Sequence, residues 1–518
     1  METVSMLQKK GHKDTLRSYY TDDDTLVSYM VRLLNPTNGD VCLEPSAGSG
    51  CFIDGLLATQ KELDICAVEI SCEASHNLKL KYQGVDNITI FQDDFLQPQQ
   101  QIKTQSILFD RIIANPPYGG WQEYERRDYL KSRFPDLYVK ETYGIFVAHS
   151  LTQLKPGGRS VYILPETFLY LHLQKGLRKR LLEQYSIQSV DVFPSSVFPG
   201  VNFGYAKLCI ICIDNYLAST SHSFSIRHSN SLSELISQCG KTFEVNQALV
   251  INRPEYTFPL LGYSQETSFI DSYHLQLGDI ADCVTGIYSG ADTQFLYRSP
   301  ENLRGVSKYP EIEKSRLYDA TIEGKLGIDG LEGNNCFIPV LKGGGFSYFK
   351  PELWFFDWSS KAVMHYKTDK KARFQNSHFY FKKGIGFPMV SSGRSSASVI
   401  KESWIFDQSV VGIFPKSNHH FCFLLAFLNS STCWRLLRQI NPSTNNSAKY
   451  IKRLPIVLPT VEGLAWFEIM VSEYLHNLEL GKERNMLIEQ QLDEEVGSLY
   501  AEAILRYSTI EIPDYDRK

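Results

Sequence analysis

The chain has 518 residues, of which 43% are hydrophobic and 21% charged, with a formal net charge of −5. This composition is ordinary for a soluble globular protein of about two to four domains. No stretch approaches the roughly 18 to 20 apolar residues of a membrane span, and no signal-peptide pattern begins the chain, so we expect a cytoplasmic protein without a membrane partner. The 11 cysteines form no framework, and Cys209 and Cys212 lie in an apolar run. We expect reduced structural thiols and no metal site.

Charge is unevenly distributed along the chain. Residues 361 to 383 contain seven Lys or Arg and one acid, and residues 408 to 461 contain six basic residues and no acid. Aromatic residues lie within the first of these runs: Tyr366, Phe374, Phe379, Tyr380 and Phe381. Basic residues interleaved with aromatic rings favour contact with nucleic acid over a merely solvated face.

Helical and strand patterns alternate in the first part of the chain. Apolar residues at helical spacing follow Asp22, Asp23 and Asp24, whose carboxylates suit the start of a helix. Short apolar runs that predict strands lie at 41–43, 65–70, 88–91, 111–114, 160–164, 189–192 and 206–213. Strands separated by helices predict a doubly wound α/β fold with a mostly parallel sheet.

The alternation divides the chain into four parts. Residues 1–215 form the predicted α/β domain, and the polar, Ser-rich residues 216–265 are interpreted as a connecting segment. Residues 266–460 consist of short Gly- and aromatic-rich segments that predict a mixed α+β domain. Residues 461–518, rich in Glu with Leu and Met at helical spacing, predict a helical C-terminal segment.

Three successive predicted strands end in residues suited to a nucleoside. The first leads into the small-residue turn 44–50, where the backbone can approach a ligand at a helix N-terminus. Glu69 ends the second strand at the position where a carboxylate accepts ribose hydroxyls, and Asp94 and Phe95 follow the third. Because the turn begins with an acid and lacks a phosphate-binding lysine, it favours a nucleoside over a phosphate-rich ligand.

The most informative feature is Asn115-Pro116-Pro117-Tyr118, directly after the predicted strand 111–114. Two consecutive prolines hold an extended backbone and donate no N–H groups. The Asn115 side chain and the Pro116 carbonyl can accept hydrogen bonds from a planar amine, and the Tyr118 ring can stack on its plane. A surface turn of polyproline type is the structural alternative. The tetrapeptide indicates chemistry on an exocyclic amine.

In this order, the motifs resemble those of S-adenosylmethionine-dependent DNA adenine-N6 methyltransferases, and more narrowly the gamma, or TaqI-like, group. Ser18-Tyr19-Tyr20-Thr21 is similar to the leading cofactor motif of that group, although Asp22 stands where the family has proline. The resemblance implies a Rossmann-like methyltransferase domain followed by a target-recognition domain. It also implies that S-adenosyl-L-methionine is bound by Tyr20, Thr21, Glu44, Ser46, Ala47, Gly48, Gly50, Glu69, Ile70, Asp94, Phe95 and Asn115.

The resemblance further implies methyl transfer to adenine N6 in double-stranded DNA, with Asn115, Pro116, Pro117 and Tyr118 as catalytic residues. Tyr118 and Phe198, with Phe203 as an alternative to Phe198, would stack on a base flipped out of the duplex. Residues 285–290, 342–346 and 388–394 look like recognition domains of restriction–modification and BREX-type phage-defence methyltransferases. We expect a stand-alone modification enzyme, with a separate cognate restriction endonuclease as a candidate partner.

Other activities fit parts of the pattern. Cytosine-N4 methylation uses the same pocket logic, and RNA and protein-glutamine methyltransferases also carry Asn-Pro-Pro-Tyr loops. A non-catalytic DNA-binding protein could retain the fold, and a dinucleotide-dependent oxidoreductase shares the first turn and Glu69. The oxidoreductase, however, gives no use for the tetrapeptide at 115–118.

Overall fold

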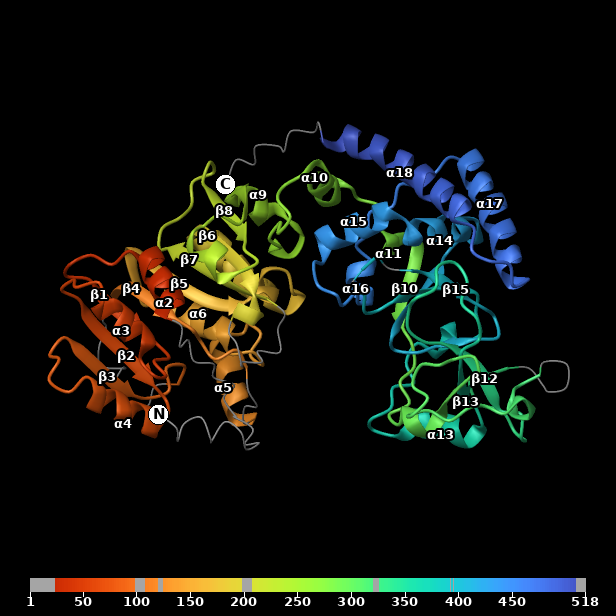
Figure 1. The fold of residues 1–518 in the computed structure, drawn as a ribbon, viewed down its shortest axis with the longest axis horizontal. Coiled ribbons are helices and arrows are strands. Elements are labelled where there is room, and N and C mark those ends of the chain that lie inside the picture. Colours follow the sequence, from red (N-terminus) through yellow and green to blue (C-terminus); the bar gives the residue numbers. More distant parts are fainter. Residues whose placement is uncertain are drawn as a thin grey trace. The chain divides into compact units, whose positions relative to one another are not determined.

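The computed structural model describes residues 24–97, 108–119, 124–197, 207–319, 326–391, 393–394 and 396–508. The chain divides into two compact units, Met1–Tyr263 and Ser264–Lys518, each with its own core (Figure 1). The boundary between the units lies beside the predicted start of the second domain at residue 266.

The first unit contains a nine-stranded sheet in the order β3-β2-β1-β4-β5-β7-β6-β8-β9. Its strands are β1 (Val41–Glu44), β2 (Asp64–Glu69), β3 (Ile88–Gln92), β4 (Phe109–Ala114), β5 (Leu154–Pro165), β6 (Ser186–Pro194), β7 (Lys207–Asp214), β8 (Ser223–His228) and β9 (Lys241–Asn246). Strands β3, β2, β1, β4 and β5 run parallel, whereas β7 is antiparallel to both β5 and β6. The predicted α/β class with a mostly parallel sheet is confirmed.

Helices alternate with these strands, whose short apolar runs are typical of buried strands in a parallel sheet. They are α2 (Asp24–Leu34), α3 (Cys51–Leu57), α4 (Cys72–Lys81), α5 (Tyr124–Arg133), α6 (Tyr143–Leu151) and α7 (Lys175–Gln184). Leu26, Met30 and Leu34 are fully buried along one side of α2. Cys209 and Cys212 are buried and free within β7, so the prediction of structural thiols there is confirmed.

The prediction of a connecting segment over residues 216–265 was wrong, because β8 and β9 extend the sheet beside β6. The buried Gln247 side chain accepts from Ile187 N at 2.9 Å and donates to the Leu182 and Tyr185 carbonyls at 2.9 and 2.7 Å. These bonds join the segment 216–265 to the end of α7 and the start of β6. The Ser-rich composition concealed two short strands whose apolar residues alternate, such as Phe224 and Ile226.

A buried polar cluster also ties this segment to the domain. Asp191 of β6 is fully buried, and it accepts from the Tyr29 hydroxyl of α2 at 2.8 Å and from Arg227 of β8 at 2.6 Å. Burial raises the pKa of the Asp191 carboxyl, while Arg227 and Tyr29 oppose that shift. The cluster therefore joins α2 and β6 to β8, which lies in the segment predicted to be a connection.

The second unit contains two four-stranded sheets, in the orders β10-β17-β14-β15 and β11-β13-β12-β16. These strands are β10 (Ala281–Thr285), β11 (Leu296–Arg298), β12 (Phe337–Leu341), β13 (Trp354–Asp357), β14 (Gly384–Pro388), β15 (Ser398–Ile400), β16 (Ile405–Phe406) and β17 (Val410–Pro415). The longer helices are α10 (Gln265–Ser272), α13 (Ser360–Thr368), α14 (Phe421–Asn429), α15 (Ser431–Ile440), α17 (Val461–Glu479) and α18 (Met486–Ser508). The predicted α+β domain and helical C-terminal region are confirmed.

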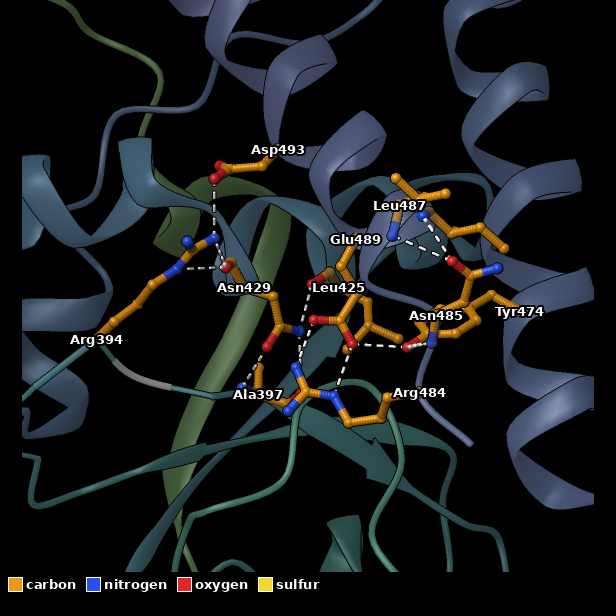
Figure 2. A network of polar contacts seen from close by, with 11 residues as sticks. Arg394, Ala397, Leu425, Asn429, Tyr474, Arg484, Asn485, Leu487, Glu489 and Asp493 are labelled. Atoms are coloured by element: carbon orange, nitrogen blue, oxygen red, sulfur yellow. Dashed lines mark hydrogen bonds and ion pairs between the residues drawn. The ribbon is translucent and has the colours of Figure 1, made fainter. Parts of the chain in front are cut away.

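The two C-terminal helices share the core of this unit. The Phe427 ring of α14 stacks on Tyr500 of α18 with centroids 5.1 Å apart, and Phe423 contacts Phe467 of α17. Figure 2 shows the polar contacts beside this core, where Arg394 donates to the Asn429 carbonyl and to Asp493. Arg394 therefore holds α14 and α18 together. Among the described residues, no helix has the length and apolar character needed to span a membrane.

Candidate active site

The glycine-rich turn lies at the carboxyl end of β1 and leads into α3. Gly48 and Gly50 adopt φ values of 53° and 82°, which favour glycine. A Cβ atom at Gly50 would lie 2.7 Å from both Leu78 Cδ2 and the Tyr82 hydroxyl. The backbone is held by Ala47 N, which donates to Val68 O at 2.9 Å. The predicted small-residue turn therefore packs closely against β2 and α4.

Glu69 is half-buried at the end of β2 and joins this turn to the next helix. One carboxylate oxygen accepts from Gly48 N and the other from Ser71 N, both at 2.8 Å. A carboxylate offers about four acceptor positions, so two backbone bonds leave room for hydroxyl donors. Ile70, the next residue, exposes 42% of its surface. A carboxylate and an apolar side chain thus lie together beside the turn.

Glu44 begins the turn and is almost fully buried, with 1% exposure. Its Oε2 atom has no hydrogen-bond partner among the described residues. Burial, and then the neighbouring Glu69, raise the pKa of the Glu44 carboxyl well above its usual value. The side chain is therefore a neutral carboxylic acid over a wider pH range than an exposed Glu.

Asp94 and Phe95 follow β3 as predicted, but both have protein partners. The Asp94 carboxylate accepts from Arg126 Nη2 of α5 at 3.0 Å and from Leu96 N at 3.0 Å. The Phe95 ring is 3% exposed and stacks on Phe146 of α6 with centroids 5.5 Å apart. A nucleobase would contact the Phe95 ring only if that ring were uncovered.

The tetrapeptide 115–118 lies at the carboxyl end of β4, the strand next to β1. Ser46 of the glycine-rich turn donates from its hydroxyl to the Asn115 carbonyl at 3.2 Å. The Thr142 hydroxyl donates to the Pro117 carbonyl at 2.7 Å. The predicted cofactor turn and the predicted catalytic loop are therefore in direct contact.

Tyr118 points into the domain in this structure. It is 1% exposed, its hydroxyl donates to Ile163 O at 3.4 Å, and its ring meets the edge of Tyr143 with centroids 6.4 Å apart. Its ring is therefore not exposed to a stacking partner. Asn115 and Pro117 are half-buried, and Pro116 is buried.

Some predicted residues lie outside the described part of the chain. These are Tyr20, Thr21 and Phe198, together with the alternative Phe203. Conversely, Thr142 and Arg126 contact the site although sequence reasoning did not select them. Thr142 directly precedes the motif Tyr143-Gly144, so proximity to that motif was the available signal. Among the described residues, no cluster of three or more His, Cys, Asp or Glu could hold a metal ion.

In the second unit, the aromatic residues of the basic run 361–383 do not form the exposed surface that the sequence predicts. Tyr366 and Tyr380 are buried, with 1% and 4% exposure, and the remaining aromatic residues of the run pack against the same core. The rings therefore form the interior of the unit and do not offer a stacking surface for bases. The pattern of rings among lysines arose because helix α13 and the following turn each have one buried side.

The lysines of the same run remain at the surface. Lys370 and Lys371 are exposed, and neither side chain has a hydrogen-bond or ion-pair partner among the described residues. Their turn is fixed on the segment 288–290, since Tyr288 and Arg373 exchange two backbone hydrogen bonds of 3.1 and 2.8 Å. A Cβ atom at Gly290, which has φ 78°, would lie 2.9 Å from Ala372 N. The segment 288–290, part of a predicted recognition-domain motif, therefore lies beside the turn of the basic run 361–383.

Residues 56–198 match the Eco57I restriction-modification methylase family. The chain is 24% identical over 296 residues to the type II methyltransferase M.AccI of Acinetobacter calcoaceticus, covering 55% of this chain and 54% of that protein. It is 21% identical over 387 residues to the adenine-specific methyltransferase BrxX of Escherichia coli O9:H4 (strain HS), covering 70% of this chain and 29% of that protein. The match thus spans about half of M.AccI and less of BrxX.

A solved structure shares the fold over most of the chain. The ATP-dependent Type ISP restriction-modification enzyme LlaBIII bound to DNA aligns with a TM-score of 0.54 at 11% identity, covering 91% of this chain and 40% of that one. The predicted resemblance is therefore confirmed: the chain is similar to methyltransferases of restriction–modification systems, and its residues 56–198 match the Eco57I family.

Proposed function

We propose that the protein is a site-specific DNA methyltransferase that transfers a methyl group from S-adenosyl-L-methionine to adenine N6 in double-stranded DNA. The observation that carries the proposal is the contact between the glycine-rich turn and the loop 115–118, through Ser46 and the Asn115 carbonyl. This contact supports the proposal because the turn is predicted to bind a nucleoside and the loop is predicted to offer acceptors for an amine. The name of M.AccI supports methyl transfer, and the name of BrxX, an adenine-specific methyltransferase, supports adenine as the target.

The residues present fit the proposed cofactor. Glu69 keeps acceptor positions for ribose hydroxyls, and the exposed Ile70 offers an apolar surface beside it. The buried Glu44 carboxyl has an oxygen without a described partner, which suits a polar group of the ligand. S-adenosylmethionine held there would supply an electrophilic methyl group. The amine nitrogen would bond to the methyl carbon, the carbon–sulfur electron pair would stay on sulfur, and the amine proton would leave to solvent.

The loop 115–118 would make the amine nucleophilic. The lone pair of an exocyclic amine is delocalised into the base, so it needs help to become available. Hydrogen bonds from both N–H groups to Asn115 Oδ1 and the Pro116 carbonyl would favour a tetrahedral nitrogen. They would also stabilise the positive charge that develops there during transfer.

The target base must leave the duplex to reach this loop, because N6 is enclosed by base pairing and stacking. Stacking on Tyr118 would offset an unstacking cost of roughly a few kcal/mol. Since the Tyr118 ring is buried against Tyr143, this role requires the ring to become exposed when DNA binds. Phe198 remains the proposed second stacking residue.

The surface of the second unit supports DNA as the carrier of the amine. Lys370 and Lys371 lie beside the segment 288–290, and neither side chain has a hydrogen-bond or ion-pair partner among the described residues. Lysines of this kind neutralise phosphates without reading sequence. In a restriction–modification or related defence system, the chain would be the modification enzyme, with a separate restriction endonuclease as its partner.

The rival activities are separated by what accepts the methyl group. Wild-type protein is incubated with tritiated S-adenosylmethionine and, in parallel, with unmethylated genomic DNA, total RNA and a protein extract, and the DNA product is hydrolysed to nucleosides. We expect label on N6-methyl-2′-deoxyadenosine from DNA and no label on RNA or protein. Label on N4-methylcytosine would establish the cytosine alternative, and label on RNA or protein would replace the DNA assignment.

A second binding assay tests the non-catalytic and oxidoreductase alternatives. Calorimetry is performed with S-adenosylmethionine and with NAD on the same protein. We expect binding of S-adenosylmethionine only. Preferential NAD binding would overturn the proposal, and DNA binding without any cofactor binding would establish the non-catalytic alternative.

A further inference from the structure

The loop 115–118 is held in place by side-chain hydroxyls. Proline has no N–H group, so two consecutive prolines remove two donors through which a loop is usually fixed. At the two prolines themselves, only the carbonyls can take part in backbone hydrogen bonds. The Asn115 carbonyl accepts from Ser46 Oγ at 3.2 Å, and the Pro117 carbonyl accepts from Thr142 Oγ1 at 2.7 Å.

The carbonyl between these two is different. Among the described residues, no donor reaches the oxygen of Pro116, although this residue is buried. A carbonyl oxygen without a donor keeps its acceptor positions available, and a donor on a ligand can fill them. The two hydroxyls therefore occupy the flanking carbonyls and leave the central one for an incoming amine.

The Thr142 hydroxyl bonds the loop and does not cap its own helix. It is the N-cap residue of α6, where a Thr hydroxyl ordinarily accepts from an amide of the first turn. Thr142 makes no such bond, whereas Ser430 and Thr460 cap α15 and α17 in the ordinary way. Its hydroxyl is directed to the Pro117 carbonyl instead, and Thr142 itself is only 6% exposed.

The support behind Thr142 is rigid. Every residue of α6, Tyr143–Leu151, is buried, and the Tyr143 ring contacts the Tyr118 ring edge to face. The start of α6 therefore contacts the loop at two successive residues, Pro117 and Tyr118. A displacement of the loop relative to α6 would break the Thr142 hydrogen bond and the contact between the Tyr118 and Tyr143 rings.

We propose that Thr142 is a positioning residue for methyl transfer, which fixes the Pro117 carbonyl so that the Pro116 carbonyl faces the substrate amine. This inference rests on the proposed function. Loss of the hydroxyl should reduce the rate of transfer more than the binding of cofactor or DNA, because misplacement of reacting groups by about 1 Å can cost on the order of 100-fold in rate.

The test compares four full-length proteins: wild type, Thr142→Val, Thr142→Ser and Thr152→Val. Valine keeps the shape of threonine without its hydroxyl, and serine keeps the hydroxyl. Thr152 is the matched control, since its hydroxyl donates to the His149 carbonyl at 2.7 Å at the other end of α6. Single-turnover transfer of tritiated methyl to unmethylated genomic DNA is measured, with cofactor affinity by calorimetry and folding by thermal unfolding.

We expect Thr142→Val to slow transfer by about 10- to 100-fold with cofactor and DNA affinities within about twofold of wild type. Thr142→Ser should recover most of the rate, and Thr152→Val should match wild type. A Thr142→Val protein with the wild-type rate would overturn the inference. So would one that loses cofactor binding or unfolds, since the role would then be structural. Wild-type protein without activity on DNA would instead refute the proposed function, and the inference with it.

Discussion

Removal of two surface lysines should change the salt dependence of DNA binding by a calculable amount. Lys370 and Lys371 are exposed on the turn that is fixed to Tyr288, and neither side chain has a described partner. Each phosphate contact contributes about 0.9 to the slope of log K against log salt. The variant Lys370→Ala/Lys371→Ala should therefore lower the magnitude of that slope by about 1.8.

The difference is large enough to measure by fluorescence anisotropy with a labelled duplex. From about 50 to about 200 mM salt, the wild type should lose about 12-fold more affinity than the variant. The matched control, Lys482→Ala/Arg506→Ala, removes two exposed cations from the acid-rich region of α17 and α18. Its slope should equal that of the wild type.

Two results would exclude this turn as a specific phosphate contact. An unchanged slope in the lysine variant would show that this turn does not contact phosphates. An equal decrease in the control would show that the effect reflects net charge and not a particular surface. Since the surrounding aromatic rings are internal, the variant should also bind different duplexes with an unchanged order of preference.

Three further variants test the first unit. Glu44→Gln should be as stable as wild type below pH 4.5 and more stable above it, by about 1.4 kcal/mol per pH unit up to the pKa of Glu44 in the folded protein. The reason is that the raised pKa makes the folded wild type keep a proton that the unfolded chain releases. A stability difference in urea unfolding that does not change with pH would contradict this. Gln247→Leu leaves one N–H and two carbonyls unpaired and should cost about 3 kcal/mol or more of unfolding free energy, whereas the exposed Gln490→Leu should be neutral. Glu69→Gln presents an amide N–H₂ to the donors Gly48 N or Ser71 N and should weaken S-adenosylmethionine about tenfold or more in calorimetry; wild-type affinity would exclude Glu69 from the cofactor site.

The sequence predicts the strands that position the site because their apolar runs are buried on both faces of a parallel sheet. Ile112 and Ile113 of β4 are fully buried, and few structures other than a buried strand explain such a short apolar run. The strands β8 and β9 were missed for the opposite reason. They are the last two strands at one end of the sheet, with β9 at its edge, and in both of them polar residues alternate with apolar ones.

The polar residues of the site were predictable as a set but not in their contacts. Motif spacing indicates that Glu69 and Gly48 belong to one site, and Gly48 N donates to Glu69 Oε2 at 2.8 Å. Spacing cannot show that Asp94 pairs with Arg126, or that Thr142 bonds Pro117, because these partners come from helices whose placement depends on packing. The same limit explains why aromatic residues among lysines were interpreted as a base-stacking surface.

The central claim is methylation of adenine N6 in DNA by the loop 115–118. It is tested most directly by methylation-sensitive long-read sequencing of DNA from cells that express the wild type or Asn115→Ala, with calorimetry to verify that the variant still binds S-adenosylmethionine. We expect N6-methyladenine within one sequence context in the wild-type cells and none in the variant cells. Methylation that persists with Asn115→Ala, or that falls on cytosine, would contradict it.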